Sequence, residues 1–309
     1  MVERGTIVGV LMGGLSTERA VSLETGAAVL AALRERGWSA VAIDVGRDLP
    51  QRLLAEGVQV AWIALHGRFG EDGCVQGLLE TLGVPYTGSG VLASSVAMDK
   101  AFTKRFLRGV PGVTLARDEL VHRGSPLPSL LPCVVKPCVG GSTIGISRCE
   151  HSSELEGAVL AALDLDARVL VEELIEGDEI TVAVVDGQPL PVVRIIPQSG
   201  FFDFEAKYTK GRTEYEVPAS IPADIAARAQ SAAVAAYEAL GCSGLARADF
   251  IVRQDGEPVF LEINTLPGMT STSLSPMAAG AIGITFPDLV ERVLHGAHVM
   301  PSEVSGPES

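Results

Sequence analysis

Residues 245–274 read LARADFIVRQDGEPVFLEINTLPGMTSTSL, and the alternation in this stretch decides the fold around it. Two runs in which apolar and polar residues alternate flank the pair Asp255-Gly256. An Asp-Gly pair is typical of two-residue β-hairpin loops. The pattern therefore predicts two antiparallel strands that are joined by a loop of these two residues.

The predicted hairpin has one polar face and one apolar face. A two-residue loop places Asp249 opposite Glu262 and Arg247 opposite Asn264. Side chains that oppose each other across an antiparallel pair point to the same face, so these four form one polar cluster. The residues predicted to face the core are Ala248, Phe250, Val252, Val259, Leu261 and Ile263.

The polar cluster predicts a metal site. Opposed Cβ atoms lie roughly 5 Å apart, so Asp249 and Glu262 repel each other unless a cation lies between them. Carboxylate and amide oxygens are ligands that Mg²⁺ or Mn²⁺ prefers, and Asn264 supplies the amide. Arg247 beside them can hold a phosphate or carboxylate oxygen. Two alternatives stay open: a surface hairpin with scattered salt bridges, and a one-residue slip that removes the Asp249–Glu262 pair.

Length and composition restrict the class of protein. A chain of 309 residues that is 47% hydrophobic and 20% charged predicts a compact protein of two or three domains. Its net charge of −14 argues against nucleic acid and anionic membrane as partners. The five cysteines include no CxxC pair, and no signal peptide or membrane span is evident. We therefore expect a cytoplasmic protein with reduced thiols.

The N-terminal part has the pattern of an open parallel sheet. Thr6–Met12 is a continuous apolar run, as in a buried parallel strand, and Ser22 is a candidate N-cap for a helix to Arg36. Val58–Leu65 is a second buried strand, which ends in the loop 66–73. Ligands bind at such carboxyl ends of parallel strands. A dinucleotide-binding fold is disfavoured because the G-x-G-x-x-G sequence is missing, and there is no Walker A sequence either.

Three motifs carry a resemblance to a known family. They are HGRFGEDG at residues 66–73, KPCVGGSTIG at 136–145, and EIN followed by LPGMT at 262–270. With these motifs the chain resembles the ATP-grasp ligases and, within them, the D-alanine–D-alanine ligases, from about Gly9 to about Leu294.

The resemblance implies an α/β fold in three parts. An N-terminal open parallel-sheet domain at residues 1–95 precedes a two-part ATP-grasp fold. Its central subdomain spans residues 96–176, and its C-terminal subdomain spans residues 177–309 and carries the metal site. A lid around residues 201–213 is expected to close on ATP.

The same resemblance implies roles for individual residues. The ATP-binding set is Lys100, Lys136, Glu172, Glu173, Ile175, Glu179 and Lys207. In it the lysines bind phosphates, backbone groups near Glu173 and Ile175 bind adenine, and the side chains of Glu172 and Glu179 meet the purine amine and the ribose. The catalytic set is Glu18, His66, Ser142, Tyr208, Arg247 and Gly268. The first D-alanine lies beside Glu18, Ser142 and Tyr208, and a substrate carboxylate lies near Ser273 and Leu274. Asp249, Glu262 and Asn264 hold two Mg²⁺ or Mn²⁺ ions.

The implied activity is the ATP-dependent joining of two D-alanines, through an acyl phosphate, for peptidoglycan synthesis. The lid tyrosine predicts dipeptide formation rather than D-alanyl-D-lactate. The alternatives are a related ligase with another acceptor, such as D-lactate or D-serine, and a nucleotide-binding homologue without ligase activity. A homodimer is also expected from the family.

Overall fold

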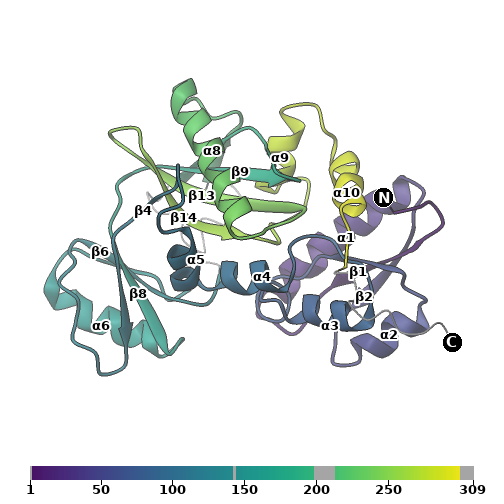
Figure 1. Cartoon of the computed structure of the whole chain (residues 1–309), viewed down its shortest axis with the longest axis horizontal. Coiled ribbons are helices and arrows are strands. Elements are labelled where there is room, and N and C mark those ends of the chain that lie inside the picture. The colour runs from purple at the N-terminus through teal and green to yellow at the C-terminus, as the bar shows by residue number, and fades with distance from the viewer. Residues whose placement is uncertain (1, 142–143, 198–212, 300–309) are drawn as a thin grey trace.

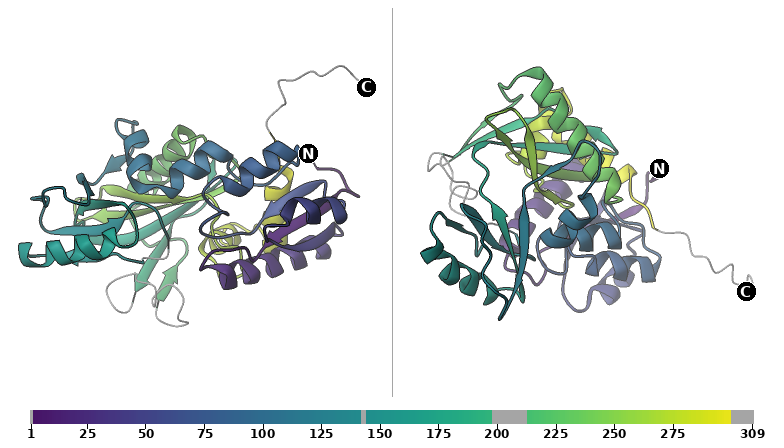
Figure 2. Two further views of the ribbon diagram at one scale, coloured as in Figure 1. Left: turned by 90° about the horizontal axis from the view of Figure 1, so that it is seen from below. Right: turned by 60° about the vertical axis from the view of Figure 1, so that its left-hand side comes forward.

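The computed structural model describes residues 2–141, 144–197 and 213–299. These residues form three sheets, each with its own helices (Figure 1). Seen from below, the sheet that carries α6 is a lobe at one end of the molecule, and the N-terminal sheet lies at the other end (Figure 2). The structure confirms the α/β class. Among the described residues, no helix is long and apolar enough to span a lipid bilayer.

The N-terminal sheet is parallel, with strand order β2-β1-β3. Its elements are β1 (Ile7–Met12), α1 (Arg19–Glu35), β2 (Ser39–Asp44), α2 (Leu49–Ala55), β3 (Val60–Ile63), α3 (Cys74–Leu82) and α4 (Val91–Met98). The predicted strands are confirmed, but the predicted cap at Ser22 is wrong. Helix α1 begins at Arg19 with Glu18 at the N-cap position, and the buried Ser22 hydroxyl, inside the helix, donates to the Ala64 carbonyl (2.7 Å) just after β3.

The second sheet has four strands in the order β5-β8-β6-β7, all paired antiparallel. Its elements are β5 (Asp118–His122), β6 (Cys133–Pro137), β7 (Ser147–Cys149), α6 (Ser152–Leu163) and β8 (Arg168–Glu173). Helix α6 covers one face through buried Leu155 and Val159, which pack with Val135, Val169 and Val171 of the strands. The opposite face of this sheet is left for the pocket described below.

The third sheet has seven strands, in the order β12-β11-β9-β13-β14-β4, with β10 paired to β9. Its strands are β4 (Thr114–Leu115), β9 (Gly177–Val185), β10 (Gln188–Pro189), β11 (Val193–Pro197), β12 (Thr213–Glu216), β13 (Leu245–Arg253) and β14 (Pro258–Asn264). Helix α8 (Ala223–Ala239) packs its alanine-rich buried side on β9, β13 and β14. The long central strands β9 and β13 therefore have one face covered by α8.

The hairpin of β13 and β14 confirms both predicted pairs, Arg247–Asn264 and Asp249–Glu262. The predicted two-residue loop is wrong. Arg253 N–H donates to Glu257 O (3.0 Å), so three residues form the loop, and Gly256 supplies its left-handed conformation at φ +82°.

A bulge restores the predicted register away from the turn. The register shifts between Asp249 and Phe250, which leaves Leu261 as the extra residue on β14. Leu261 was predicted to lie in the core, but it is half-buried and lines the pocket, and Phe260 is fully buried instead. The bulge therefore turns an apolar side chain toward a ligand site while the polar pairs stay in place.

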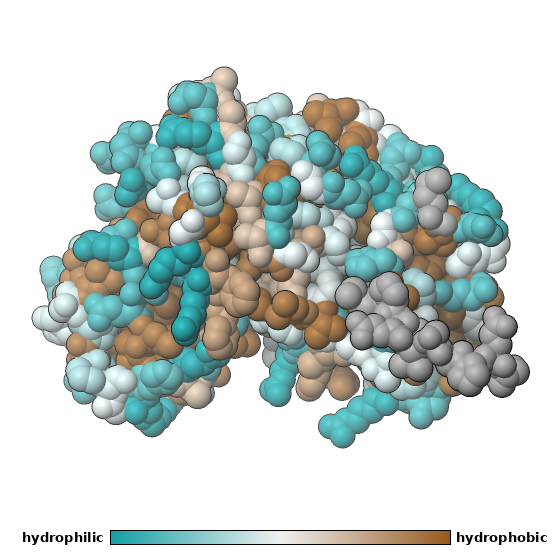
Figure 3. Space-filling model, viewed as in Figure 1, coloured by the Kyte–Doolittle hydropathy of each residue, from teal (hydrophilic) through white to brown (hydrophobic). Residues whose placement is uncertain are grey.

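Two further packing features join the three parts. Helix α10 (Phe286–His295) lies against α1, and α9 (Leu274–Gly280) packs on α10 and β9, so that all four share one core with the N-terminal sheet (Figure 1). Helix α5 (Lys100–Leu107) follows α4 and lies beside α8. Apolar surface is visible in the middle of the face in Figure 3, and α4 and α5 expose Leu92, Phe102 and Phe106. The predicted domain boundary at 95/96 falls within α4, and that at 176/177 falls between β8 and β9.

Candidate functional site

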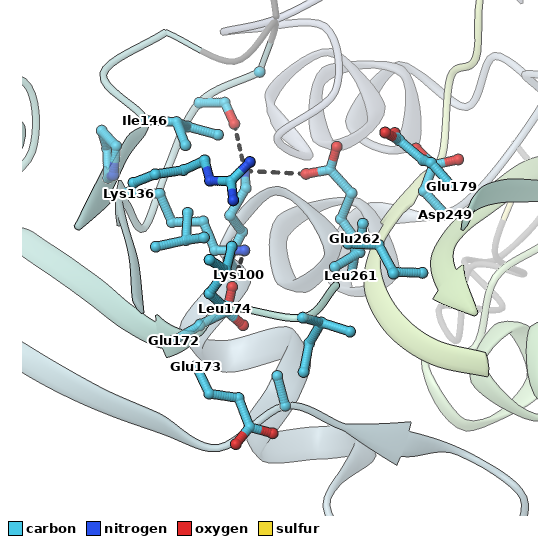
Figure 4. A pocket seen from close by; sticks show the side chains of 18 of the residues that line it. Lys100, Lys136, Ile146, Glu172, Glu173, Leu174, Glu179, Asp249, Leu261 and Glu262 are labelled. Atoms are coloured by element: carbon cyan, nitrogen blue, oxygen red, sulfur yellow. Dashed lines mark hydrogen bonds and ion pairs between the residues drawn. The ribbon is translucent and has the colours of Figure 1, made fainter. Parts of the chain in front are cut away.

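A cavity of about 430 Å³ lies between the four-stranded and seven-stranded sheets. This volume is in the range of small-molecule sites. Figure 4 shows Lys136, Ile146 and Glu172 on one side, with Glu179, Asp249 and Glu262 across from them. The residues predicted from the sequence that line this cavity are Lys100, Lys136, Glu172, Glu173, Ile175, Glu179, Asp249 and Glu262. Stretches as far apart as Lys100 and Glu262, 162 residues along the chain, thus meet around one space.

Helix α5 delivers Lys100 to the cavity from its first turn. The Asp99 side chain caps the helix by accepting from Phe102 N–H (3.0 Å), and it pairs with Arg168 of β8. The Lys100 ammonium donates to the Gly140 carbonyl (2.6 Å) and lies 3.3 Å from Glu262 Oε2. Lys100 therefore bridges the glycine-rich loop after β6 and the carboxylate on β14.

Glu172 is a buried carboxylate between two buried lysines. Its Oε2 contacts the Lys136 ammonium, and its Oε1 contacts the ammonium of Lys104, one turn after Lys100 on α5. Burial opposes ionisation of Glu172, but Lys136 and Lys104 outweigh that effect and hold its pKa below the usual value. Burial likewise lowers the pKa of Lys104, and Glu172 offsets part of that shift. Glu172 is thus balanced by two cations, Lys136 in the lining of the cavity and Lys104 behind it.

The chain passes from β8 into β9 along the cavity wall. Glu173 closes β8, and its backbone N–H donates to Arg117 O (2.9 Å). Burial raises the pKa of Glu173, but the pairing with the Arg117 guanidinium brings it below the usual value. Ile175 follows in the crossover, and Glu179 stands on β9 opposite Ile251 of β13. The crossover therefore brings backbone groups and the carboxylates of Glu173 and Glu179 to the same space.

The predicted metal ligands are adjacent, and each has a partner in the structure. The Asp249 carboxylate accepts from Arg247 Nε (2.9 Å) and Nη2 (2.8 Å) and from Thr181 Oγ1 (2.5 Å). The Asn264 side-chain oxygen accepts from Leu266 N–H (3.0 Å). Burial opposes the charge of Arg247, but Asp249 outweighs it and raises the Arg247 pKa. Asp249 and Asn264 thus each accept hydrogen bonds from other protein groups, and Glu262 is paired with Lys100.

This donor set fits a hard divalent cation. Mg²⁺ is usually held by one or two protein carboxylates and completed by substrate phosphates and water. Asp249 and Glu262 lie opposite each other and both line the cavity, which matches that requirement. Among the described residues there is no group of three His, Cys, Asp or Glu side chains placed to hold a metal. The site thus supplies two carboxylates and one amide rather than a complete protein cage.

Glu18 and His66 lie beside the cavity rather than in its lining. A Cβ placed on Gly67 would come within 2.5 Å of Glu18 Oε2, and one on Gly141 would lie 3.7 Å from Glu18 Oε1. Glu18 thus lies between the loop after β3 and the glycine-rich loop. The buried His66 ring contacts Thr25 Oγ1 (3.0 Å) and Glu71 Oε1 (3.3 Å). Both ring nitrogens of His66 therefore have protein partners.

The remaining predicted residues fall into two groups. A Cβ placed on Gly268 would lie 3.1 Å from Oγ of Ser273. Ser273 is the N-cap of α9, and Leu274 is the first residue of that helix. Ser142, Lys207 and Tyr208 lie outside the described residues, as does most of the predicted lid.

Several residues at the site were not predicted from the sequence. Lys104 pairs with Glu172, Asp99 caps α5, Thr181 donates to Asp249, and Ile146 lines the cavity. Lys104 had one local signal, because it stands four residues after Lys100 and so lies on the same face of the helix. The Asp99 cap is also local, but the contacts of Asp99 with Arg168 and of Thr181 with Asp249 join distant segments, which sequence spacing does not reveal.

Comparison with known proteins identifies the family. Models of the N-terminus and C-terminus of D-ala D-ala ligase match residues 48–89 and 122–295. A D-alanine–D-alanine ligase of Syntrophotalea carbinolica is 52% identical over 293 residues, 94% of this chain and 95% of that protein. One of Geobacter sulfurreducens is 49% identical over 300 residues, 95% of each chain.

Solved structures agree with these relatives. The D-alanine–D-alanine ligase of Bacillus anthracis complexed with ATP has a TM-score of 0.83 and 36% identity, covering 94% of this chain and 97% of that one. VanG D-Ala:D-Ser ligase from Enterococcus faecalis has a TM-score of 0.82 and 29% identity, covering 94% and 99%. The family suggested by the motifs is thus confirmed over nearly the whole chain: the protein belongs to the D-alanine–D-alanine ligases, which are ATP-dependent ligases.

Proposed function

We propose that this protein joins two D-alanines into D-alanyl-D-alanine at the expense of ATP, in the synthesis of peptidoglycan. The observation that supports this most is the cavity between the two sheets. Its wall carries two lysines suited to phosphates and two opposed carboxylates suited to a divalent cation. Both sets of groups are what transfer of a phosphoryl group requires.

The reaction has two steps. The carboxylate of the first D-alanine attacks the γ-phosphorus of ATP, and the bond from that phosphorus to the bridging β-phosphate oxygen breaks. This forms an acyl phosphate and releases ADP. The neutral amine of the second D-alanine then attacks the acyl carbon, and inorganic phosphate leaves. Lys100 and Lys136 bind the phosphates and offset their charge, since both ammonium groups line the cavity.

Asp249, Glu262 and Asn264 are the residues that would hold Mg²⁺ or Mn²⁺, most simply two ions together with the phosphates. Such ions supply neutralisation of the charge on the phosphates during transfer. The Lys100 ammonium lies 3.3 Å from Glu262 Oε2, and it would contact a phosphate in place of that carboxylate when the ions are bound.

The amino-acid substrates lie next to the nucleotide in this proposal. Glu18, beside the glycine-rich loop, binds the ammonium of the first D-alanine together with Ser142 and Tyr208. His66, in the loop after β3, places its imidazole ring near the phosphate that is transferred. Arg247 and the backbone at Gly268 stabilise the oxyanion of the tetrahedral intermediate, and Ser273 with Leu274 binds a carboxylate.

The acceptor decides between related activities, since one similar structure is a D-Ala:D-Ser ligase. The test is ADP release with product identification by mass spectrometry, with D-alanine, L-alanine, D-serine and D-lactate offered as separate acceptors. We expect D-alanyl-D-alanine as the main product and little D-alanyl-D-lactate at pH 7. ADP release that is no faster with any acceptor than without one would support the nucleotide-binding homologue instead.

Compartment and assembly complete the proposal. All five cysteines are described and free, and ATP is the substrate, so we place the enzyme in the cytoplasm. We also propose a homodimer, as expected for the family. Light scattering on the purified protein tests the assembly, and a monomer at micromolar concentration would contradict it.

A further inference from the structure

Lys104 is a buried cation that the reaction as described does not use. It has 1% of its surface exposed, and it lies behind the cavity wall rather than in its lining. Its ammonium contacts Glu172 Oε1 and donates to the Ala116 carbonyl (3.3 Å). Burying an ammonium costs free energy unless the charge is paired, so we expect the function of Lys104 to lie in its pairing with Glu172.

Glu172 connects Lys104 to the cavity. The carboxylate is 3% exposed, yet Glu172 and Lys136 both line the cavity. Among the described residues, Glu172 Oε1 accepts no hydrogen bond of normal geometry, so its contact with Lys104 is an ion pair. The cavity wall therefore offers an ionised acceptor, and Lys104 is the second of the two cations that balance it.

We propose that Lys104 is a positioning residue that keeps Glu172 an ionised, acceptor-only group, and that it thereby sets a preference for a 6-amino purine over a 6-oxo purine. This inference rests on the proposed function, in which the Glu172 side chain meets the purine amine. An ionised carboxylate accepts a hydrogen bond from the amine of adenine. It repels the carbonyl oxygen that hypoxanthine carries at the same position, because two acceptors then face each other.

Removal of the Lys104 charge changes what Glu172 can recognise. With one cation instead of two, the buried carboxylate takes up a proton more readily. A protonated carboxyl can donate as well as accept, so it can hydrogen-bond to a carbonyl oxygen. The discrimination between the two purines should then decrease, even where the overall shape of the site is kept.

The experiment measures equilibrium binding of ATP and inosine triphosphate, with Mg²⁺, to the wild type and to Lys104→Met. We expect the wild type to prefer ATP by at least about tenfold, which corresponds to about 1.4 kcal/mol. Lys104→Met should reduce that ratio to about threefold or less. Lys100→Met is the matched control, because it removes a charge one turn earlier on α5 at the phosphate end. It should weaken both nucleotides and leave their ratio unchanged.

A second pair of variants tests whether Lys104 acts through Glu172. In the Glu172→Gln background, which is already neutral, adding Lys104→Met should cause no further change in the ratio. If Lys104→Met does not fold, Lys104→Gln replaces it, since the amide can still donate to Ala116 O without a charge. An unchanged ratio in the folded Lys104 variant, or an equal change in both backgrounds, overturns the inference. Ligation of D-alanine is measured separately, so its absence would contradict the proposed function while the nucleotide ratios still test Lys104.

Discussion

At the scale of single residues, the site depends on charges that are paired before any ligand arrives. Glu262 is within 3.3 Å of Lys100, Asp249 is held by Arg247, and Glu172 lies between two lysines. Removing a partner from such a buried pair is more damaging than removing an exposed charge, because the remaining charge is left uncompensated. Substitutions at these positions should therefore separate binding effects from stability effects.

The metal assignment predicts a large loss in Glu262→Gln. The amide keeps the shape of the side chain but removes the charge that faces Asp249 and the proposed ions. We expect turnover to fall by about 100-fold or more, with a higher Mg²⁺ requirement. Steady-state ADP release over a range of Mg²⁺ checks this, with circular dichroism as the control for folding. Near-normal turnover at ordinary Mg²⁺ would contradict the assignment.

The charge on Glu172 predicts a pH-dependent contribution to stability. Its pKa in the folded state is lowered by Lys136 and Lys104, despite the opposing effect of burial. The stabilisation is therefore present above the pKa of an unfolded glutamate, about 4.3, and is lost as the pH falls through the folded-state value. Glu172→Gln should lower the free energy of unfolding by about 3 kcal/mol at pH 7.

Urea unfolding at pH 7, 5, 4 and 3 tests this difference. The gap between Glu172→Gln and the wild type should narrow below about pH 4. Glu238→Gln on the exposed side of α8 is the control, and it should match the wild type throughout. A gap that stays constant down to pH 3 would show that ionisation of Glu172 does not stabilise the fold.

At the scale of elements, α5 links the phosphate end of the cavity to its back wall. Its first residue is Lys100, and its second turn carries Lys104. The position of the helix depends on Asp99, which caps it and also pairs with Arg168 of the neighbouring sheet. One residue thus controls where two lysines lie.

Asp99 predicts a graded pair of variants. Asparagine is as good an N-cap as aspartate but carries no charge, so Asp99→Asn loses only the pairing with Arg168. Asp99→Ala loses both, and the cap alone should cost about 1 kcal/mol of stability. We expect KM for ATP to rise in the order wild type, Asp99→Asn, Asp99→Ala. Thermal unfolding and ATP titration check this order, and equal effects of the two variants would argue against a capping role.

At the scale of the whole molecule, the N-terminal part and the C-terminal sheet meet through backbone. A Cβ placed on Gly244, just before β13, would lie 3.1 Å from the Gly88 Cα. The N-terminal part and the C-terminal sheet also share a hydrophobic core, which includes residues of β9 and α10. Loss of this close contact should therefore loosen the docking of the N-terminal part on the metal-bearing hairpin.

Gly244→Ala and Gly241→Ala isolate that contact. Both glycines have left-handed backbone (φ +61° and +67°), so alanine costs about 1 kcal/mol at either position. Only Gly244 has a neighbour, because nothing lies within 4 Å of a Cβ on Gly241. In urea unfolding, the free energy of unfolding of Gly244→Ala should be about 1 kcal/mol lower than that of Gly241→Ala. Equal losses in the two variants would mean that the interface adjusts without cost.

The local patterns of the sequence determined the hairpin of β13 and β14 and its polar face. Alternation with period two needs only neighbouring residues, so Asp249 opposite Glu262 could be predicted from residues 245–264. The buried parallel strands were also predicted from local patterning, and the motifs indicated the family. The bulge at Leu261 was not predictable, because it depends on a three-residue turn and on what the strand packs against.

Only the tertiary structure decided which distant groups meet. Lys104 and Glu172 are 68 residues apart, and so are Thr181 and Asp249, yet both pairs are in contact at the site. Such contacts follow from how sheets and helices pack across the whole chain, and no local periodicity encodes them. The sequence thus determined the chemistry available on each element. The packing of α5 between two sheets decided that Lys100 contacts Glu262 and that Lys104 lies behind Glu172.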